Sequence, residues 1–288
     1  MPPHSAATLI GFGAIVLWSA LALMTAASGT IPPFELAALT FLIGGGLGVP
    51  TLLRNPQGFG VMRQPLPVWI LGIGGLFLYH AVYFAALRLA PPAEAGLIAY
   101  LWPLLIVLMS ALLPGERLRA GHVIGALAGF GGVALLLGSK EGGFGFDPRY
   151  GAGYALAFCC AFIWSGYSIL SRRYKNAPTE MVAVYCLATA ALSLVAHCLF
   201  ETTVWPDGTV QWLAVAGLGL GPVGAAFYLW DHGVKRGDIK LLGVTSYAAP
   251  VLSTLLLVVT GYAEASLALG LAAVLIVGGA LLATRAGS

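Results

Sequence analysis

Apolar residues gather in ten long runs along the chain, each of about 20 residues and bounded by short polar or proline-containing stretches. A helix of about 20 residues spans the roughly 30 Å hydrocarbon core of a bilayer. The pattern therefore predicts ten transmembrane helices. They lie at 8–28, 34–53, 67–87, 93–113, 119–138, 151–171, 180–200, 210–231, 239–260 and 265–283.

Within each run the apolar positions are continuous and do not alternate with polar ones. An outer-membrane barrel needs strands of about ten residues that alternate, so the pattern excludes one. Composition agrees, since 59% of residues are hydrophobic, 9% are charged and the mean hydropathy is +0.91. The predicted fold class is an all-α integral membrane protein in the lipid bilayer. The first run is predicted to be a helix and not a cleaved signal, because its leader MPPHSAAT has no Lys or Arg.

The basic residues divide unequally between the two sides that these spans create. Positively charged loops stay in the cytoplasm. We therefore expect a multi-pass protein of the inner (plasma) membrane with both termini cytoplasmic. Because topology accounts for these residues, the net charge of +3 predicts no nucleic-acid partner. Eleven of the 14 fall on the side of the N-terminus, namely Arg54, Arg63, Arg117, Arg119, Arg172, Arg173, Lys175, Lys235, Arg236, Lys240 and Arg285, and three fall on the other side, namely Arg88, Lys140 and Arg149.

Several sequence signatures occur twice at nearly the same distance. A tandem duplication with halves at 1–138 and 151–288, joined by a linker loop at 139–150, explains them. Each half has five spans, an odd number, so the halves enter the membrane in opposite orientations. Such inverted repeats around a central cavity are typical of transporters. The pairs are Tyr100-x-x-Pro103 with Tyr247-x-x-Pro250, Trp18-Ser19 with Trp164-Ser165, Pro33-x-Glu35 with Pro178-x-Glu180, and Trp69 with Trp212.

Pro103 and Pro250 each lie in the middle of a predicted span. Proline lacks an amide donor and frees the carbonyl four residues earlier, here at Ala99 and Ser246. A free carbonyl inside a membrane needs a partner. Neighbouring groups or a water can supply it, so that each proline only kinks its helix, or a substrate amine can bind there.

The stretch YLWPLLIVLMSALLPGERLRAGHVIGALAGFGGVALLL from Tyr100, with its weaker copy YAAPVLSTLLLVVTGYAEASLALGLAAVLIVGGALL from Tyr247, resembles the drug/metabolite transporter superfamily in its ten-helix form with two EamA-type halves. The resemblance covers nearly the whole chain. Within that superfamily the chain looks most like the YddG-type aromatic amino acid exporters. The resemblance implies a basket of ten helices, a central cavity formed mainly by helices 1, 3, 4, 6, 8 and 9, and amino acid export by alternating access.

Aromatic residues at mid-depth are the candidates for a substrate site. Tryptophan usually gathers at the membrane interfaces, yet three tryptophans lie mid-span here. Tyr79 and Tyr83 are four apart and share a helix face, and His80 lies beside Tyr79 in the sequence. Tyr100 and Pro103 are three apart on the next span. Together these groups could line a cavity that stacks an aromatic ring or holds an organic cation, or they can serve only as helix packing. The predicted substrate-binding residues are Trp18, Tyr79, His80, Tyr83, Tyr100, Trp102, Pro103, Trp164, Ser246 and Pro250.

Ionisable residues within the spans are few. His80 is a candidate for a substrate or proton role, or a neutral histidine bonded to a carbonyl. His197 is expected to be structural, while His122 and the pair Asp231-His232 are expected to be solvated near helix ends. No Asp or Glu is predicted at mid-depth, whereas small multidrug resistance relatives depend on a glutamate in helix 1. We therefore expect weak or absent proton coupling.

Glycines predict both close packing and one hinge. Gly121, Gly125 and Gly129 recur every four residues, as do Gly44 and Gly48, a spacing that lets helices approach closely. The hinge is predicted at Gly217, Gly219, Gly221 and Pro222.

Other function classes find little support in the sequence. Catalytic motifs and a P-loop are missing, and the loops are too short for a catalytic domain, so we expect no enzyme. A channel lacks its ring of carboxylates. The four cysteines show no CxxC spacing, so neither a metal site nor a cofactor is expected. A multidrug or other metabolite exporter remains the alternative, and the oligomeric state stays open.

Overall fold

The structure, a computed structural model, describes residues 3–139, 144–261 and 264–287. Lys140 and the linker residues 141–143 lie outside this part of the chain, so the predicted position of Lys140 stays a prediction. The described residues form helices and no strands, and ten helical spans are long and apolar enough to cross a membrane. The predicted all-α membrane fold with ten spans is therefore confirmed.

The first five spans correspond to the first half of the chain. Span 1 consists of α1 (Pro3–Ser19) and α2 (Leu21–Ala27), and span 2 is α3 (Pro33–Arg54), followed by the short η1 (Gly58–Met62). Span 3 consists of α4 (Leu66–Ile73), the π-helical η2 (Gly74–Leu78) and α5 (Tyr79–Leu89). Span 4 consists of α6 (Pro92–Ala99), α7 (Trp102–Met109) and η3 (Ser110–Leu112), and span 5 is α8 (Ala120–Gly138).

The second half repeats this order. Span 6 is η4 (Pro148–Tyr150) with α9 (Gly151–Arg173), and span 7 is α10 (Met181–Phe200). Span 8 consists of α11 (Gly208–Leu220), the π-helical η5 (Gly221–Ala225) and α12 (Ala226–Arg236). Span 9 consists of α13 (Ile239–Thr245) and α14 (Ala248–Val259), and span 10 is α15 (Leu267–Gly287).

The same interruptions recur in both halves. The π-helical turns begin at Gly74 and Gly221, which are 147 positions apart like the two Tyr-x-x-Pro signatures. Spans 4 and 9 are each divided into two short helices, and Pro103 and Pro250 lie in the first turn of the second helix of each pair. A proline is tolerated at that position because the first amides of a helix have no partner within it. The prolines therefore mark helix breaks and not simple kinks.

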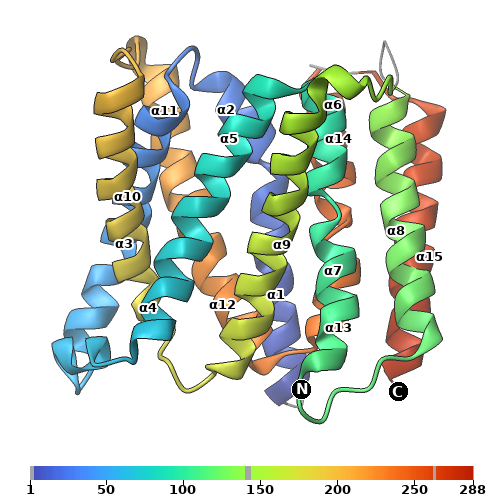
Figure 1. Cartoon of the computed structure of the whole chain (residues 1–288), viewed down its shortest axis with the longest axis horizontal. Helices are drawn as coiled ribbons and strands as arrows, with labels where there is room; N and C mark the ends of the chain where they lie inside the picture. The colour runs from blue at the N-terminus through green and yellow to red at the C-terminus, as the bar shows by residue number, and fades with distance from the viewer. Residues whose placement is uncertain (1–2, 140–143, 262–263, 288) are drawn as a thin grey trace.

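The helix pairs confirm that the halves are inverted repeats. α3 packs against α10 and α8 against α15, so equivalent helices of the two halves lie side by side. α1 packs against α12, and its equivalent α9 packs against α5, the equivalent of α12. Both ends of the described chain lie on one face of the bundle (Figure 1), which we call the termini face.

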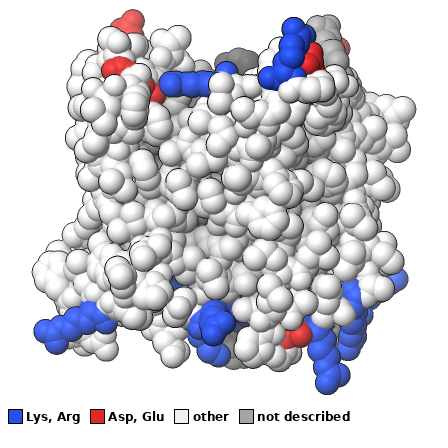
Figure 2. Space-filling view, viewed as in Figure 1, with Lys and Arg blue, Asp and Glu red and all other residues white. Residues whose placement is uncertain are grey.

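Charged side chains lie at the two ends of the bundle, with an uncharged band between them in the view of Figure 2. The largest buried cluster joins residues of both halves, including Ile15, Phe41, Trp102, Trp164 and Trp230. Glycines allow the close contacts that were predicted: a Cβ on Gly44 would lie 2.9 Å from Gly224 Cα, and one on Gly121 would lie 3.2 Å from the Leu282 carbonyl oxygen. The chain is thus a multi-pass membrane protein whose halves share one core.

The duplicated Pro-x-Glu motif has the same role in both halves. Glu35, in the first turn of α3, accepts a hydrogen bond from the backbone N–H of Val204, which follows α10, at 2.9 Å. Glu180, just before α10, accepts one from the Asn55 amide, which follows α3, at 3.1 Å. Each glutamate therefore fixes the loop that leaves the partner helix, at opposite faces of the membrane.

Candidate functional site

Six aromatic rings from three predicted and three unpredicted positions meet in the middle of the bundle. The ring centroids of Trp18 lie 6.2 Å from those of Trp102 and 5.7 Å from those of Trp164, and Trp102 and Trp164 lie 6.3 Å apart. These edge-to-face distances are favourable for aromatic pairs. Together with Tyr167, Phe227 and Trp230, which contact this group, they form what we call the aromatic centre.

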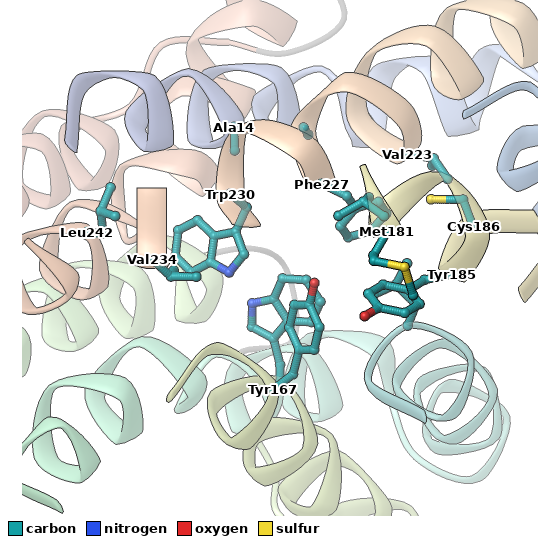
Figure 3. Close-up of a cluster of buried hydrophobic side chains, with 14 of the residues drawn as sticks. Ala14, Tyr167, Met181, Tyr185, Cys186, Val223, Phe227, Trp230, Val234 and Leu242 are labelled. Atoms are coloured by element: carbon teal, nitrogen blue, oxygen red, sulfur yellow. The ribbon is translucent and has the colours of Figure 1, made fainter. Parts of the chain in front are cut away.

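The unpredicted members come from α9 and α12. Figure 3 shows Phe227 and Trp230, both on α12, pointing toward the side of the cluster where Tyr167 of α9 lies. Trp230 lies 5.1 Å from Trp18 and 5.7 Å from Trp102, ring centre to ring centre. The sequence pattern placed Trp230 at the end of a span predicted to stop at residue 231, but the span continues to Arg236. Its position 147 residues after Tyr83 was the signal that could have identified it.

Tyr79, His80 and Tyr83 of α5 extend the aromatic centre on one side. Tyr79 lies 5.4 Å from Trp164 and stacks on Tyr83 at 5.9 Å. His80 lies 4.9 Å edge-on to Phe41, and its Nδ1 lies 2.7 Å from the Leu76 carbonyl oxygen. All three are partly exposed, as is Tyr100, which directly follows α6. The structure thus brings together six of the ten predicted residues, namely Trp18, Tyr79, His80, Tyr83, Trp102 and Trp164.

The predicted residues of helix 9 are placed differently. Ser246 is fully buried, and its hydroxyl donates to the Leu242 carbonyl of its own helix at 2.6 Å. Its backbone carbonyl accepts from the Ala249 N–H at 3.1 Å. The Pro250 carbonyl accepts from the Thr254 hydroxyl at 2.9 Å. In this conformation local groups therefore satisfy the Ser246 carbonyl, as in the simpler of the two interpretations.

Two of the polar tips in the aromatic centre are already bonded. The Trp18 indole N–H donates to the Pro222 carbonyl at 3.1 Å, next to the π-helical turn, and the Trp230 indole N–H donates to the Ser168 hydroxyl at 3.1 Å. Within the described residues, the indole N–H groups of Trp102 and Trp164 have no hydrogen-bond partner. The same holds for the hydroxyls of Tyr79, Tyr83 and Tyr100. The free groups here are thus neutral donors beside aromatic faces.

Part of the predicted hinge coincides with the π-helical turn. Gly221 and Pro222 begin that turn, whereas Gly217 and Gly219 belong to α11. A Cβ on Gly219 would lie 2.6 Å from Ile43 Cβ, which shows close packing against α3. π-helical turns often occur at functional positions, so the hinge stays a prediction for Gly221 and Pro222 above all.

Two groups that were expected to be solvated are buried. Asp231 is 1% exposed and pairs with Lys235 at 2.8 Å, and His122 is 1% exposed, with its Nδ1 accepting from the Arg119 N–H at 3.1 Å. The expectation was wrong because α9 and α10 cover the end of α12 and because α15 covers the first turn of α8. His232 is partly exposed, as expected. His197 contacts Glu201 and Thr203, in keeping with a structural role.

An ion cluster holds three segments together at the termini face. The Glu116 carboxylate accepts from Arg172 and from Lys240, each at 2.7 Å. Arg172 also donates to the Val234 and Gly237 carbonyls at 3.0 and 2.7 Å, at the end of α12. Burial raises the pKa of the Glu116 carboxyl, but the hydrogen bond and charge of Lys240 together with Arg172 outweigh burial and leave that pKa below its ordinary value.

The opposite face has a hub of its own at Glu201. Its carboxylate accepts from the backbone N–H groups of Phe34 and Glu35, each at 3.1 Å, at the start of α3. It also lies 3.4 Å from Arg88 and 3.0 Å from His197. Glu94, near the start of α6, accepts from the Gly145 and Phe146 amides and from the Tyr154 hydroxyl. These contacts fix helix ends and lie apart from the aromatic centre.

A hollow beside the α9–α10 connection lies apart from the predicted substrate-binding residues in the described part of the chain. Among the described residues, no group of three or more His, Cys, Asp or Glu side chains could hold a metal ion. The hollow, of about 420 Å³, lies at the termini face, between the α3–α4 and α9–α10 connections, where it is lined by Asn55, Lys175 and Arg236 among others. None of the predicted substrate-binding residues lines it.

Comparisons with known proteins agree with this architecture. The chain is 65% identical to the aromatic amino acid exporter YddG of Ancylobacter novellus over 281 residues, 98% of each chain, and 31% identical to the protein of that name from Escherichia coli (strain K12), again over 98% of each. A solved crystal structure that is 64% identical superposes with a TM-score of 0.94, covering 99% of this chain and 100% of the other. The sequence signature of the EamA-like transporter family matches residues 5–138 and 151–285, one match in each repeat. The chain therefore belongs to the EamA-like transporter family.

Proposed function

We propose that the chain exports amino acids, aromatic ones above all, by alternating access through the aromatic centre. The observation that carries the proposal is the full-length likeness to a relative named as an aromatic amino acid exporter. The chemistry of the aromatic centre supports it, because flat rings stack on the side chain of such a substrate. The proposed substrate-contacting residues are the sequence-predicted residues that lie at the aromatic centre.

Neutral groups around the aromatic centre suit a zwitterion. The free hydroxyls and indole N–H groups can donate to a carboxylate, and the ring faces can hold an ammonium group, each such contact contributing roughly 0.5–2 kcal/mol. Charged partners for either group would bind more tightly but would slow release. A neutral site therefore fits a protein that must bind and release its substrate in every cycle.

The substrate is an amino acid in this proposal, yet the family fold alone does not select it. A pseudopaline exporter from Pseudomonas aeruginosa is 36% identical over 98 residues, a third of each chain, and carries a different cargo. A multidrug or other small-metabolite exporter thus stays the second candidate. An aromatic cation that competes with amino acids for transport would favour it.

The distribution of basic residues supports an inner-membrane location with the termini face in the cytoplasm. Transport driven by the substrate gradient, with weak or no proton coupling, fits the buried carboxylates. Asp231 is neutralised by Lys235, Glu94 accepts from two amides of the loop before η4, and Glu201 accepts from the first amides of α3. A carboxylate held in this way is a poor proton carrier.

Liposomes with the purified protein test the proposal. Uptake of labelled phenylalanine, tryptophan and threonine should saturate, and Trp102→Ala and His80→Ala should reduce it. Cys198→Ala, at an exposed position outside the aromatic centre, is the control and should keep full transport. Transport of an aromatic cation without any amino acid transport would contradict the amino acid proposal and favour the second candidate.

A further inference from the structure

The two Tyr-x-x-Pro signatures lie in different environments although the repeat makes them equivalent. Tyr247 is fully buried, and its hydroxyl accepts a hydrogen bond from the Leu104 backbone N–H at 3.1 Å. Its ring packs against Phe130 at 6.3 Å and against Gly129. Tyr100 is partly exposed, and its hydroxyl has no hydrogen-bond partner among the described residues. One tyrosine is therefore engaged across the repeat interface while the other is free.

The helix break explains why the Leu104 amide needs a partner. α7 begins at Trp102, so the Leu104 N–H belongs to the first turn, whose amides have no acceptor within the helix. Tyr247 supplies that acceptor from the other half of the chain. The residue equivalent to Leu104, 147 positions later, is Val251, the fourth residue of α14 and the one directly after Pro250.

The helix packing near the two tyrosines shows the same asymmetry, close near Tyr247 and open near Tyr100. A Cβ on Gly243 of α13 would lie 3.1 Å from the Pro103 carbonyl oxygen and 3.0 Å from Val107 Cγ2, so α13 and α7 are in direct contact. The equivalent of Gly243 is Gly96 of α6. A Cβ on Gly96 would meet no atom nearer than the Tyr83 hydroxyl, at 4.0 Å. Toward the opposite face, Gly96 therefore makes no contact equivalent to the one that Gly243 makes toward the termini face.

We propose that Tyr247 and Tyr100 exchange these roles during transport. When the opposite face closes, Gly96 packs against Pro250, and the Tyr100 hydroxyl accepts from the Val251 amide. Tyr247 then leaves Leu104 and becomes a substrate-contacting residue in the place that Tyr100 holds here. Inverted repeats that adopt each other's conformation require this exchange, and it rests on the proposed function because only alternating access brings it about.

The geometry also gives the exchange two discrete states. The Leu104 and Val251 amides are fixed by their helices, so each hydroxyl is either bonded across the interface or free. Packed interfaces of this kind switch between two arrangements and do not deform continuously. Loss of one hydroxyl should therefore shift the balance toward the state in which that hydroxyl makes no hydrogen bond.

Labelling of a single cysteine measures that balance. Val107→Cys, in a background without the four native cysteines, places a thiol in the fully buried contact between α7 and α13. A water-soluble maleimide reaches it only when the termini face opens. Tyr247→Phe should raise the labelling rate about fivefold, and Tyr100→Phe should lower it by a similar factor, as expected for one hydrogen bond. Tyr150→Phe, an exposed ring at the opposite face, should leave the rate unchanged.

The response to Tyr100→Phe decides between the exchange and a purely structural role for Tyr247. A purely structural role for Tyr247 predicts faster labelling in Tyr247→Phe and no change in Tyr100→Phe, and that result would overturn the proposal. Gly96→Leu is a second variant, because its side chain would prevent the packing of α6 against Pro250. It should slow labelling and abolish transport, whereas unchanged labelling would contradict the exchange.

Labelling requires no transported substrate, so the two proposals fail separately. Opposite shifts in the two tyrosine variants without amino acid transport would leave the exchange standing and refute the proposed substrate. Saturable amino acid transport with equal labelling rates in both variants would refute the exchange alone.

Discussion

Replacing Glu116 by Gln tests the ion cluster that joins three segments at the termini face. The variant keeps the size of the side chain but leaves Arg172 and Lys240 without their shared anion. Both cations should remain in place through their carbonyl contacts, so the change removes charge and little else. We expect a measurable loss of stability.

The magnitude follows from the exposure of the side chains. Fully exposed ion pairs contribute about 0–1 kcal/mol, whereas removing one partner of a buried pair costs about 3–5 kcal/mol. The three side chains here are 11–18% exposed, between these limits but nearer to the buried one. Solvent screening at this edge position reduces the value to about 2 kcal/mol, which corresponds to a fall of roughly 4–8 °C in Tm.

Thermal unfolding followed by tryptophan fluorescence in lipid nanodiscs measures this fall. The matched control is Glu264→Gln, a carboxylate in the equivalent connection of the second half, exposed and without an ion pair among the described residues. Its Tm should stay within about 1 °C of the unchanged protein. Equal shifts in the two variants would refute the reasoning.

The pH dependence of the same measurement follows from the lowered pKa of Glu116. A carboxyl group whose pKa is lower in the folded state stabilises that state above its unfolded pKa, about 4.3, and this contribution disappears as the pH falls through the lower folded value. The difference in Tm between the unchanged protein and Glu116→Gln should therefore be full at pH 7 and shrink below about pH 4. A difference that grows on acidification would contradict this assignment.

Three further outcomes are expected. Glu201→Ala should cost about 2 kcal/mol of stability, because it removes the carboxylate that caps α3, whereas Asp207→Ala, at a helix start without a side-chain cap bond, should cost little; unfolding in denaturant compares them. Gly233→Leu should abolish transport, because a Cβ there would lie 2.5 Å from Gly11 Cα, whereas Gly270→Leu meets open space and should transport normally. Uptake by liposomes at fixed membrane potential should be the same with and without a protonophore, and a complete loss would contradict transport along the substrate gradient alone.

The length of the continuous apolar runs was sufficient to predict the spans, because each run must cover the bilayer thickness on its own. The repeat signatures predicted the inverted arrangement, because an odd number of spans in the first half reverses the membrane orientation of the second half. The sequence also marked the positions of both helix breaks through Pro103 and Pro250, although it left open whether each proline kinks its helix or frees a carbonyl for a substrate amine. Local physics thus determines most of this fold.

Long-range contacts set the limits of prediction. The burial of Asp231 and His122 depends on which helices cover them, and no local pattern carries that information. Three members of the aromatic centre were not predicted, namely Tyr167, Phe227 and Trp230. They lie there because span 8 is longer than predicted and because α9 packs against α12. Tyr100 and Tyr247 have the same signature in the sequence, and only the structure distinguishes the free hydroxyl from the bonded one.

Counterflow is the most direct test of the central claim that an aromatic amino acid crosses by alternating access. Liposomes carrying the protein are loaded with unlabelled phenylalanine, and entry of labelled tryptophan is followed in parallel with empty liposomes. The account predicts faster, saturable entry into the loaded liposomes, because the site carries unlabelled phenylalanine outward and returns with labelled tryptophan bound. Equal entry into both, or entry proportional to concentration without saturation, would contradict it.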